Sequence, residues 1–459
     1  MAGIGFELRK IYGRKTLASS IWGSLYATMT AVGPSVLVAV MLIFLKVIMD
    51  QADIAELEKR FFTFSYTYVF LISILISSLF STVLSRYISD CVFVRAEKEI
   101  CASVYGVLTV GSVISGVIML ALCIAMRVCS KVPVPFLVIY YLLGVLVTDA
   151  YNLMTYVSAL KQYKEVTFSF FLGMLLAAGV YAFTVYAMEM HVVVAAYLAL
   201  TSGYFLLVLM LTFWCVRAFG EPEGSYFAFL QYFVRYPKLL VSGGCYMMGF
   251  YIATVIYWFF SDMREQVSIF WAAPSYDLAL FLAIIANMSS LVIFVVRVET
   301  AFFDKYVAYL SALNNGSYDL IEKERENMGN VLRYQLFFVY EVQLIITVVL
   351  ICLANVFFPY LNISVQVLNM FMVLSMGLYT VFCMYFTVVF LYYFEDHAGA
   401  CAGPCVFLAV TAVVAVVAVF VGMPFYTLAL LAGGLSGWIV SFGRLRYRLE
   451  HLNAFLMCR

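Results

Sequence analysis

The sequence has little charge and almost no histidine. Asp, Glu, Lys and Arg make up 12% of its 459 residues, and only three histidines occur. Soluble domains of this length carry roughly twice that share of charged residues. The formal net charge of +1 gives no electrostatic basis for binding a nucleic acid. The composition therefore excludes an ordinary soluble protein, and we expect no nucleic-acid partner.

The sequence also lacks the motifs of hydrolytic, metal and nucleotide chemistry. No P-loop and no HExxH occur, and the three histidines lie far apart. The eleven cysteines form no CxxC pair, and the closest two, Cys401 and Cys405, begin an apolar run. We interpret the cysteines as small apolar residues. We therefore predict no catalytic residue, no metal site and no cofactor, and conclude that the protein is not an enzyme.

Long apolar runs are what the sequence has in abundance. Hydrophobic residues make up 65% of the chain, and the mean hydropathy is +1.01. A membrane-spanning helix needs about 20 mostly apolar residues. The first run is too long for a secretory signal, so it is retained as a membrane helix. The sequence predicts an all-α polytopic membrane protein with twelve spans, at residues 20–46, 61–85, 100–126, 134–160, 166–188, 192–216, 238–260, 275–296, 332–356, 366–394, 402–422 and 425–443.

Prolines support these boundaries, because proline disturbs a helix interior but is tolerated at the first turn and in connections. All but Pro34 fall at run starts or in gaps, namely Pro133, Pro135, Pro222, Pro237, Pro274, Pro359, Pro404 and Pro424. Pro34 follows Gly33 inside the first run and predicts a kink there. Such a kink is either a static packing feature or a hinge, and we take Pro34 as the hinge candidate.

The distribution of Lys and Arg predicts the orientation in the membrane. With a cytoplasmic N-terminus, the inside segments hold all of the 27 Lys and Arg except Lys46, Lys59, Arg60, Arg127, Lys131 and Arg264. Both termini are therefore predicted to be cytoplasmic. Because each half of the chain then holds an even number of spans, the two halves are predicted to be parallel repeats.

The gaps and runs together predict five segments. Residues 1–19 form an amphipathic cytoplasmic segment suited to an anionic lipid surface. Two six-helix bundles, 20–217 and 237–443, are joined by a cytoplasmic connection at 218–236, and a basic cytoplasmic tail occupies 444–459. The second bundle contains a cytoplasmic amphipathic loop at 299–330, which is either a solvated helical connector or a docking site for a partner.

Polar side chains inside the runs are the candidate functional residues. Asp149 and Asn152 lie one helical turn apart in a single run. A carboxylate inside the hydrocarbon costs on the order of 3 kcal/mol, so it faces either a water-filled path or a hydrogen-bonding partner. Further candidates for lining a translocation path are Asn287, Glu341, Gln343 and Asn369. Cations are nearly absent from the runs, whereas tyrosine is abundant at 34 residues, which favours a neutral or weakly charged cargo.

Four segments carry a resemblance to a known family. They are Met1–Lys10 (MAGIGFELRK), Ser85–Asp90 (SRYISD), Ser158–Tyr163 (SALKQY) and Arg297–Thr300 (RVET). With them the whole chain resembles the PelG-type inner-membrane transporters of Pel exopolysaccharide, a biofilm polymer. The resemblance implies a MATE-like fold of two six-helix bundles, as in the multidrug/oligosaccharidyl-lipid/polysaccharide exporter (MOP) superfamily. It also implies a multi-pass protein of the bacterial cytoplasmic (inner) membrane.

The resemblance implies a cargo and partners as well. The cargo would be a Pel-like polymer rich in N-acetylgalactosamine, made by a cytoplasmic glycosyltransferase. The polymer would be exported in a complex with a cyclic-di-GMP receptor and a scaffold subunit. Two alternatives stay open at this point. One is a scaffold subunit of the synthase complex, and the other is an ion-coupled exporter of lipid-linked oligosaccharides or small molecules, with Asp149 or Glu341 as the ion-binding acid.

Overall fold

The structure is a computed structural model that describes residues 17–52, 54–159, 163–294, 298, 300–361, 363–423 and 425–453. Most of the predicted N-terminal amphipathic segment lies outside the described residues. The same holds for Pro424 and for the last six residues of the basic tail.

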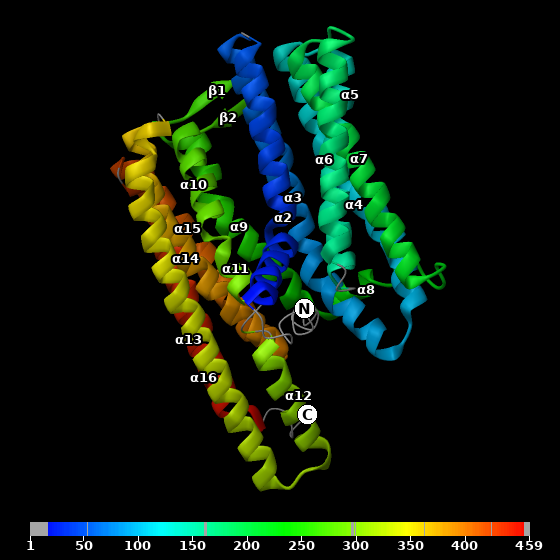
Figure 1. Ribbon diagram of the computed structural model, residues 1–459, viewed down its shortest axis with the longest axis vertical. Helices are drawn as coiled ribbons and strands as arrows, with labels where there is room; N and C mark the ends of the chain where they lie inside the picture. Colours follow the sequence, from blue (N-terminus) through cyan, green and yellow to red (C-terminus); the bar gives the residue numbers. More distant parts are fainter. Residues whose placement is uncertain are drawn as a thin grey trace. The chain divides into compact units, whose positions relative to one another are not determined.

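Twelve spans among the described residues are long and apolar enough to cross a membrane, which confirms the predicted all-helical, twelve-span fold (Figure 1). Ten are single α-helices, the eighth span joins α10 to α11, and the twelfth joins the short 3₁₀ helix η3 to α16. The spanning helices are α2 (Leu17–Gln51), α3 (Glu56–Val94), α4 (Glu97–Ser130), α5 (Val134–Ala159), α6 (Tyr163–Tyr186), α7 (Val192–Phe219), α9 (Pro237–Phe260), α10 (Pro274–Asn287), α11 (Ser289–Ile293), α13 (Tyr318–Phe357), α14 (Val365–Tyr393), α15 (His397–Val421) and α16 (Leu428–Glu450). The shorter elements are α8 (Leu230–Arg235), β1 (Glu265–Val267), β2 (Phe270–Ala272), α12 (Thr300–Asn315), η2 (Pro359–Leu361) and η3 (Phe425–Thr427).

Several helices continue well beyond their apolar runs. Helix α13 begins at Tyr318, whereas its apolar run begins at residue 332. Ser317 caps this early start, because its side chain accepts a hydrogen bond from the backbone N–H of Leu320 at 3.4 Å. At 1.5 Å per residue, the 40 residues of α13 span about 60 Å, twice the thickness of the hydrocarbon layer. The charged first part of α13 therefore projects beyond the apolar part.

Two prolines lie inside helices. Helix α2 is continuous through the buried Pro34. The predicted placement of Pro404 at a helix start is wrong, because α15 begins at His397 and contains it. The physical reason is a cap on the polar side of the apolar run. The side chain of Asp396 accepts a hydrogen bond from the backbone N–H of Gly399 at 3.0 Å and starts the helix earlier.

The chain packs as two compact units. The first holds Met29–Met247 together with Glu265–Ala272. The second holds Met248–Arg264, the described part of Ala273–Arg459 and the described start of α2 up to Thr28. Helix α9 therefore passes from the first unit to the second between Met247 and Met248. The boundary between the two units is defined by which residues pack together. The boundary between the two sequence repeats is a separate matter, and its place at the connection 218–236 stays a prediction.

Small residues allow close helix packing within each unit. In the first unit, a Cβ placed on Gly173 of α6 would lie 2.8 Å from the carbonyl oxygen of Gly203 on α7. In the second, a Cβ on Gly403 of α15 would lie 3.2 Å from the carbonyl oxygen of Gly437 on α16. Such contacts let helix backbones touch where the membrane supplies no hydrophobic driving force. Close packing therefore explains why glycine occurs at these positions within helices, where no turn requires it.

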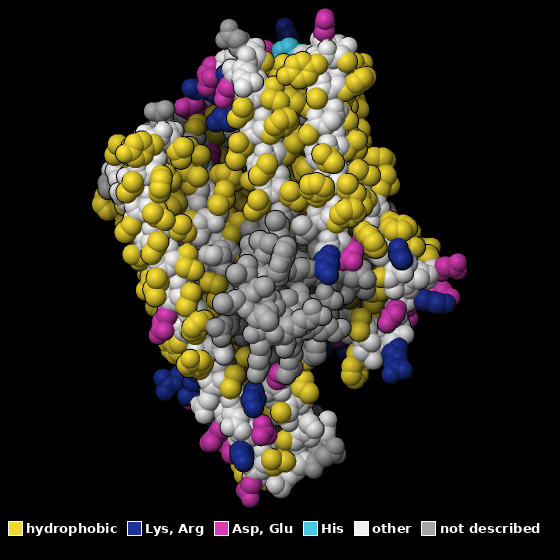
Figure 2. Space-filling model, viewed as in Figure 1, with side chains coloured by type: hydrophobic (Ala, Val, Ile, Leu, Met, Phe, Trp, Pro, Cys, Tyr) yellow, Lys and Arg dark blue, Asp and Glu magenta, His cyan; other side chains and the backbone are white. Residues whose placement is uncertain are grey.

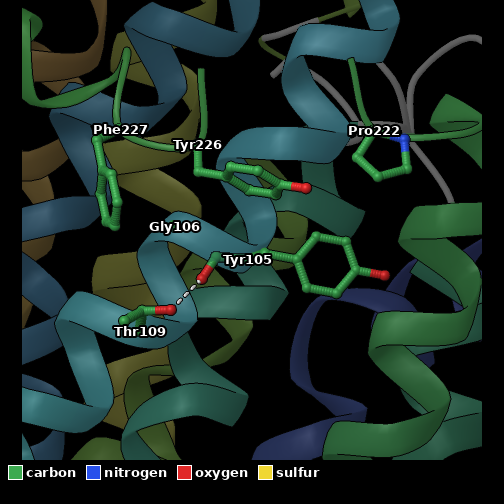
Figure 3. A pocket seen from close by; sticks show the side chains of 6 residues that line it. All are labelled: Tyr105, Gly106, Thr109, Pro222, Tyr226 and Phe227. Atoms are coloured by element: carbon green, nitrogen blue, oxygen red, sulfur yellow. Dashed lines mark hydrogen bonds between the residues drawn. The ribbon is translucent and has the colours of Figure 1, made fainter. Parts of the chain in front are cut away.

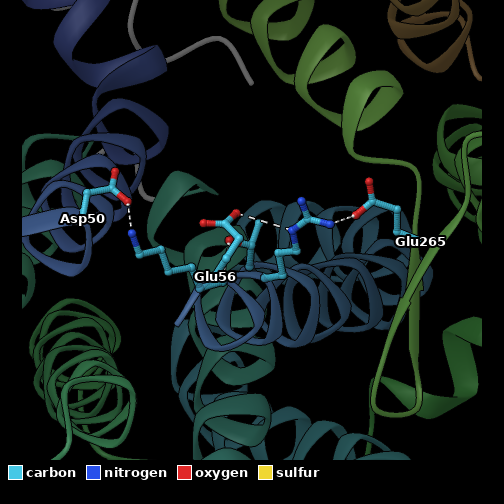
Figure 4. Close-up of polar contacts among 6 residues, drawn as sticks. Asp50, Glu56 and Glu265 are labelled. Atoms are coloured by element: carbon cyan, nitrogen blue, oxygen red, sulfur yellow. Dashed lines mark hydrogen bonds and ion pairs between the residues drawn. The ribbon is translucent and has the colours of Figure 1, made fainter. Parts of the chain in front are cut away.

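A short hairpin between α9 and α10 packs on α3 in the first unit. Strands β1 and β2 are antiparallel, with Glu265 opposite Ala272 and Val267 opposite Phe270. Arg60 bridges Glu56 and Glu265, and Figure 4 shows these two carboxylates on either side of it. Phe270 is fully buried. The first unit thus includes a hairpin, Glu265–Ala272, that follows Met247 in the sequence only after a stretch of the second unit.

Hydrophobic side chains cover the long walls of the helices, and charged side chains gather mainly toward helix ends (Figure 2). Exposed apolar residues occur along nearly every span, for example Val117 on α4 at 65% and Ile439 on α16 at 68%. A soluble protein rarely exposes apolar patches of this extent. Such a surface is suited to contact with the lipid of a membrane.

Candidate functional site

The acid predicted to matter most lies within the first unit. Asp149 and Asn152 are both on α5 and are buried, with 6% and 1% of their surface exposed. Each side chain reaches a neighbouring helix. Ser112 of α4 donates to Asp149 Oδ2 at 2.7 Å, and Ser77 of α3 donates to Asn152 Oδ1 at 2.8 Å. The structure thus brings the two predicted residues together in a polar cluster where α3, α4 and α5 pack.

Two polar atoms of this cluster make no hydrogen bond to another described residue. Within the described part of the chain, Asp149 Oδ1 and Asn152 Nδ2 are buried without a hydrogen-bond partner. Both atoms lie beside Gly111 of α4, where an added Cβ would be 3.5 Å from the first and 2.6 Å from the second. Gly111 therefore provides the room for these polar groups. Unmade hydrogen bonds at a buried carboxyl and a buried amide are costly.

A second polar cluster lies in the second unit and is fully bonded. Asn287 of α10 accepts hydrogen bonds from Gln343 Nε2 at 3.2 Å and from Thr347 Oγ1 at 3.1 Å, both on α13. Its own Nδ2 donates to the carbonyl oxygens of Ala283 and Ser375. Asn287 and Gln343 are 0% and 2% exposed. Two of the predicted path residues are thus joined to one another, and their contacts hold α10, α13 and α14 together.

The remaining predicted residues stand apart from both clusters. Glu341 lies on an exposed part of α13, and Asn369 lies on an exposed part of α14. Pro34 is buried, and a Cβ on the preceding Gly33 would lie 2.9 Å from Thr167 Cγ2 on α6. Helix α2 therefore meets α6 closely at the site of the predicted hinge.

Sequence reasoning missed a further acid within a span. Asp277 lies in the first turn of α10, and Trp258 Nε1 on α9 donates to both of its carboxyl oxygens at 3.0 Å. The backbone N–H of Ala273 also donates to Asp277, at 3.2 Å. The available signal was Pro274 followed closely by an acid, which is typical of a helix start. Asp277 thus fastens the beginning of α10 to α9.

One carboxylate at a helix end is paired with arginine. Asp396 lies between α14 and α15, and Arg444 of α16 donates to it at 2.6 and 3.3 Å. Burial raises the pKa of Asp396, but the hydrogen bonds from Arg444 and from the backbone N–H of Gly399 outweigh burial and hold this pKa below its usual value. The pair ties α15 to α16 at that end of the second unit.

A cleft of about 410 Å³ opens in the first unit between α4 and the connection that follows α7 (Figure 3). Its walls are Tyr105, Gly106 and Thr109 of α4 and Pro222, Tyr226 and Phe227 of the connection. A Cβ on Gly106 would lie 2.8 Å from the backbone carbonyl carbon of Tyr226, so glycine is needed for the connection to pack there. No polar cluster described above contributes to this cleft, and its exposed aromatic rings suit the membrane interface.

Comparison with known proteins identifies both a family and a fold. The model of the PelG family, described as "Putative exopolysaccharide Exporter (EPS-E)", matches residues 1–456. No curated protein matches the chain. Among solved structures, a MOP superfamily transporter from Pyrococcus furiosus is 12% identical, with a TM-score of 0.67 over 94% of this chain and 96% of that one.

Two MATE family structures give the same result. The Vibrio cholerae MATE transporter VcmN in its bent form is 12% identical, with a TM-score of 0.65 over 98% of this chain and 99% of that one. An outward-facing multidrug resistance MATE transporter of the MOP superfamily is 12% identical, with a TM-score of 0.65 over 94% of this chain and 96% of that one. The chain therefore has the MATE-like fold of this superfamily, as the resemblance implied.

Proposed function

The chain belongs to the PelG family of exopolysaccharide exporters, and from this premise we propose that it exports a Pel-like polymer rich in N-acetylgalactosamine. The family match over residues 1–456 is the observation that carries the proposal, and the transporter fold agrees with it. Family and spans make the chain a multi-pass inner-membrane transporter. The polymer would pass to it from a cytoplasmic glycosyltransferase, in a complex with a cyclic-di-GMP receptor and a scaffold subunit.

The charges of the buried core support a neutral cargo. Among the described residues, Arg448 near the end of α16 is the only buried Lys or Arg. An anionic pyrophosphate carrier would need several cations out of contact with water. An N-acetylhexosamine polymer has no charge to neutralise, and it offers hydroxyl and amide groups to polar side chains and apolar faces to aromatic rings.

We propose that Asp149 and Asn152 form hydrogen bonds with the cargo. The support is that each keeps a buried hydrogen-bonding atom without a partner in the described part of the chain. An amide N–H and a carboxyl oxygen can hydrogen-bond to the hydroxyls and the acetamido group of a sugar. Asn287 and Gln343 are proposed as supports of the helices that would line the path, since their hydrogen bonds are already made.

The test uses sealed vesicles that hold the chain and its glycosyltransferase with required partners, oriented so that labelled UDP-N-acetylgalactosamine reaches the enzyme from outside. Export predicts labelled polymer inside the vesicles, protected from an added glycosidase, only when the chain is present. The double variant Asp149→Leu with Asn152→Leu should lose protection while synthesis continues. Val117→Leu, on the exposed face of α4, is the matched control.

If polymer is made but remains digestible in vesicles shown to be sealed, the export proposal is wrong and a scaffold function is favoured. A second candidate function is ion-coupled export. It is favoured by Asp149 Oδ1, which has no hydrogen-bond partner among the described residues and can hold a proton or a sodium ion. The Asp149→Asn variant separates the two. Loss of pH-gradient-dependent transport with normal polymer protection in the vesicle assay would support ion-coupled export.

A further inference from the structure

An exposed side of α13 carries a seven-residue pattern. One of its members, Phe337, packs edge-on against Phe442 of α16, with 6.1 Å between the ring centroids. Leu336, Val339, Tyr340, Gln343 and Thr347 of this helix are buried against the unit. A different side of the helix exposes residues at the a and d spacing of a helix-packing seam, namely Tyr334, Phe337, Glu341, Leu344 and Val348. Tyr334 is 70% exposed and Phe337 is 50% exposed. This spacing is the one by which two helices pack side by side.

An acid stands in the middle of this exposed seam. Glu341 is eight residues from Arg333, which stands at the edge of the apolar run of α13, and so lies about 12 Å further along the helix than that edge. Its nearest seam neighbours are Phe337 and Leu344. Among the described residues, no side chain forms a hydrogen bond or an ion pair with its carboxylate. An exposed carboxylate within an apolar run is unfavourable in a membrane, and intramembrane acids normally pair with another group.

We propose that this seam binds a transmembrane helix of another protein, and that this helix supplies a Lys or Arg to Glu341. A polar residue at a single a position sets the register and choice of a partner helix, which is the role that Glu341 would serve. The required charge is positive because the free group on the seam is an acid. The proposal concerns an assembly surface and holds whatever the cargo is.

A second copy of this chain does not fit the seam. All Lys and Arg within its apolar runs stand at run edges, namely Lys46, Lys238 and Arg333. A copy would therefore bring no cation to the depth of Glu341. The partner is accordingly a different membrane protein. This assignment differs from the path role predicted for Glu341 from the sequence, because the seam side of α13 faces away from the polar cluster of Asn287 and Gln343.

The proposal can be tested with the full chain in liposomes and a defined partner. A labelled 24-residue Leu/Ala transmembrane peptide with one Lys about 12 Å from its end is compared with the same peptide bearing Leu there. Energy transfer to a label on the chain reports association. We expect the Lys peptide to associate about tenfold more strongly. The preference should vanish in Glu341→Leu, weaken in Glu341→Gln, and persist in Glu326→Gln, a control acid on α13 outside the apolar part.

Cells provide the second readout. A photo-crosslinking residue at Ile345, 63% exposed beside the seam, should yield a crosslinked peptide from a membrane protein with a Lys or Arg at matching depth. Glu341→Leu should abolish that crosslink. Equal association of both peptides with the unaltered chain, or an unchanged Lys preference in Glu341→Leu, overturns the proposal. A loss of polymer export in Glu341→Leu with peptide preference retained would return Glu341 to the path.

Discussion

The Arg60 guanidinium lies 2.6 Å from the carboxylate of Glu265, 205 residues further along the chain. Around this ion pair, the hydroxyl of Tyr68 donates to the carbonyl oxygen of Trp271 at 3.0 Å, and the hydroxyls of Ser130 and Ser268 are 2.6 Å apart. Three contacts thus fix the hairpin to α3 and α4. The ion pair is partly exposed, so it contributes only about 0.2–1 kcal/mol by itself, and its main effect is on the position of the hairpin.

We predict that reversing one charge of this pair loosens the hairpin and that reversing both restores it. The readout is disulfide formation between Ser130→Cys and Ser268→Cys, in a background where the exposed Cys129 is replaced by Ser. Arg60→Glu should slow crosslinking severalfold, and Arg60→Glu with Glu265→Arg should recover most of the original rate. Equal rates in all three proteins would show that the ion pair does not position the hairpin.

Gly111→Ala should disturb the buried acid cluster. The new methyl would lie 2.6 Å from Asn152 Nδ2, which is too close for unstrained packing. Overpacking of this kind typically costs about 1–3 kcal/mol. The measurement is the unfolding midpoint in detergent. Gly179→Ala on α6 is the matched control, since its methyl would meet nothing within 4 Å, and it should leave stability unchanged or slightly improved.

Asn287→Ala should destabilise the second unit. The substitution removes the acceptor for Gln343 Nε2 and Thr347 Oγ1 and leaves the carbonyl of Ser375 without that donor. We expect a loss of about 1–3 kcal/mol in the free energy of unfolding. Combining it with Gln343→Leu should cost less than the sum of the single changes, because both act on one network. Asn369→Ala, at an exposed position, should change stability by less than about 0.5 kcal/mol, and a strictly additive double variant would contradict the network.

The ion pair of Asp396 and Arg444 predicts a loss of stability in acid. The pKa of Asp396 is lower in the folded protein than its ordinary value of about 3.9. Its contribution is therefore complete above that ordinary value and is lost as the pH falls through the lower folded value. The stability advantage of the unaltered chain over Asp396→Asn should thus be constant from pH 7 to 5 and shrink toward pH 3. Glu450→Gln, which removes the carboxylate of an exposed ion pair with Arg446, is the comparison variant measured in parallel.

Apolar runs were sufficient to predict the number and class of helices, because each span must be long and apolar by itself. They did not predict helix ends, which depend on polar caps such as Ser317 and Asp396 that lie outside the runs. The adjacency of Asp149 and Asn152 followed from their helical spacing alone. The serines that bind them come from other helices, Ser77 on α3 and Ser112 on α4, and nothing local distinguishes these from other serines.

Side-chain direction was the other feature that the runs could not supply. Glu341 and Gln343 are two residues apart on α13, and the sequence suggested the same role for both. Two residues along a helix correspond to a rotation of about 200°, so one side chain is buried and the other is exposed. The hairpin was missed because each strand has only three residues, too few for an alternating pattern to be detected.

The packing of Phe270 has a practical consequence for hybrids between related transporters. This ring is fully buried and lies 5.0 Å from the ring of Tyr68 and 6.3 Å from that of Tyr140, although its neighbours in sequence, α9 and α10, end and begin in the other unit. A gene fusion that exchanges halves at residues 218–236 would thus place Phe270 of one parent against Tyr68 and Tyr140 of the other. Functional hybrids should require Glu265–Ala272 to come from the same parent as α3.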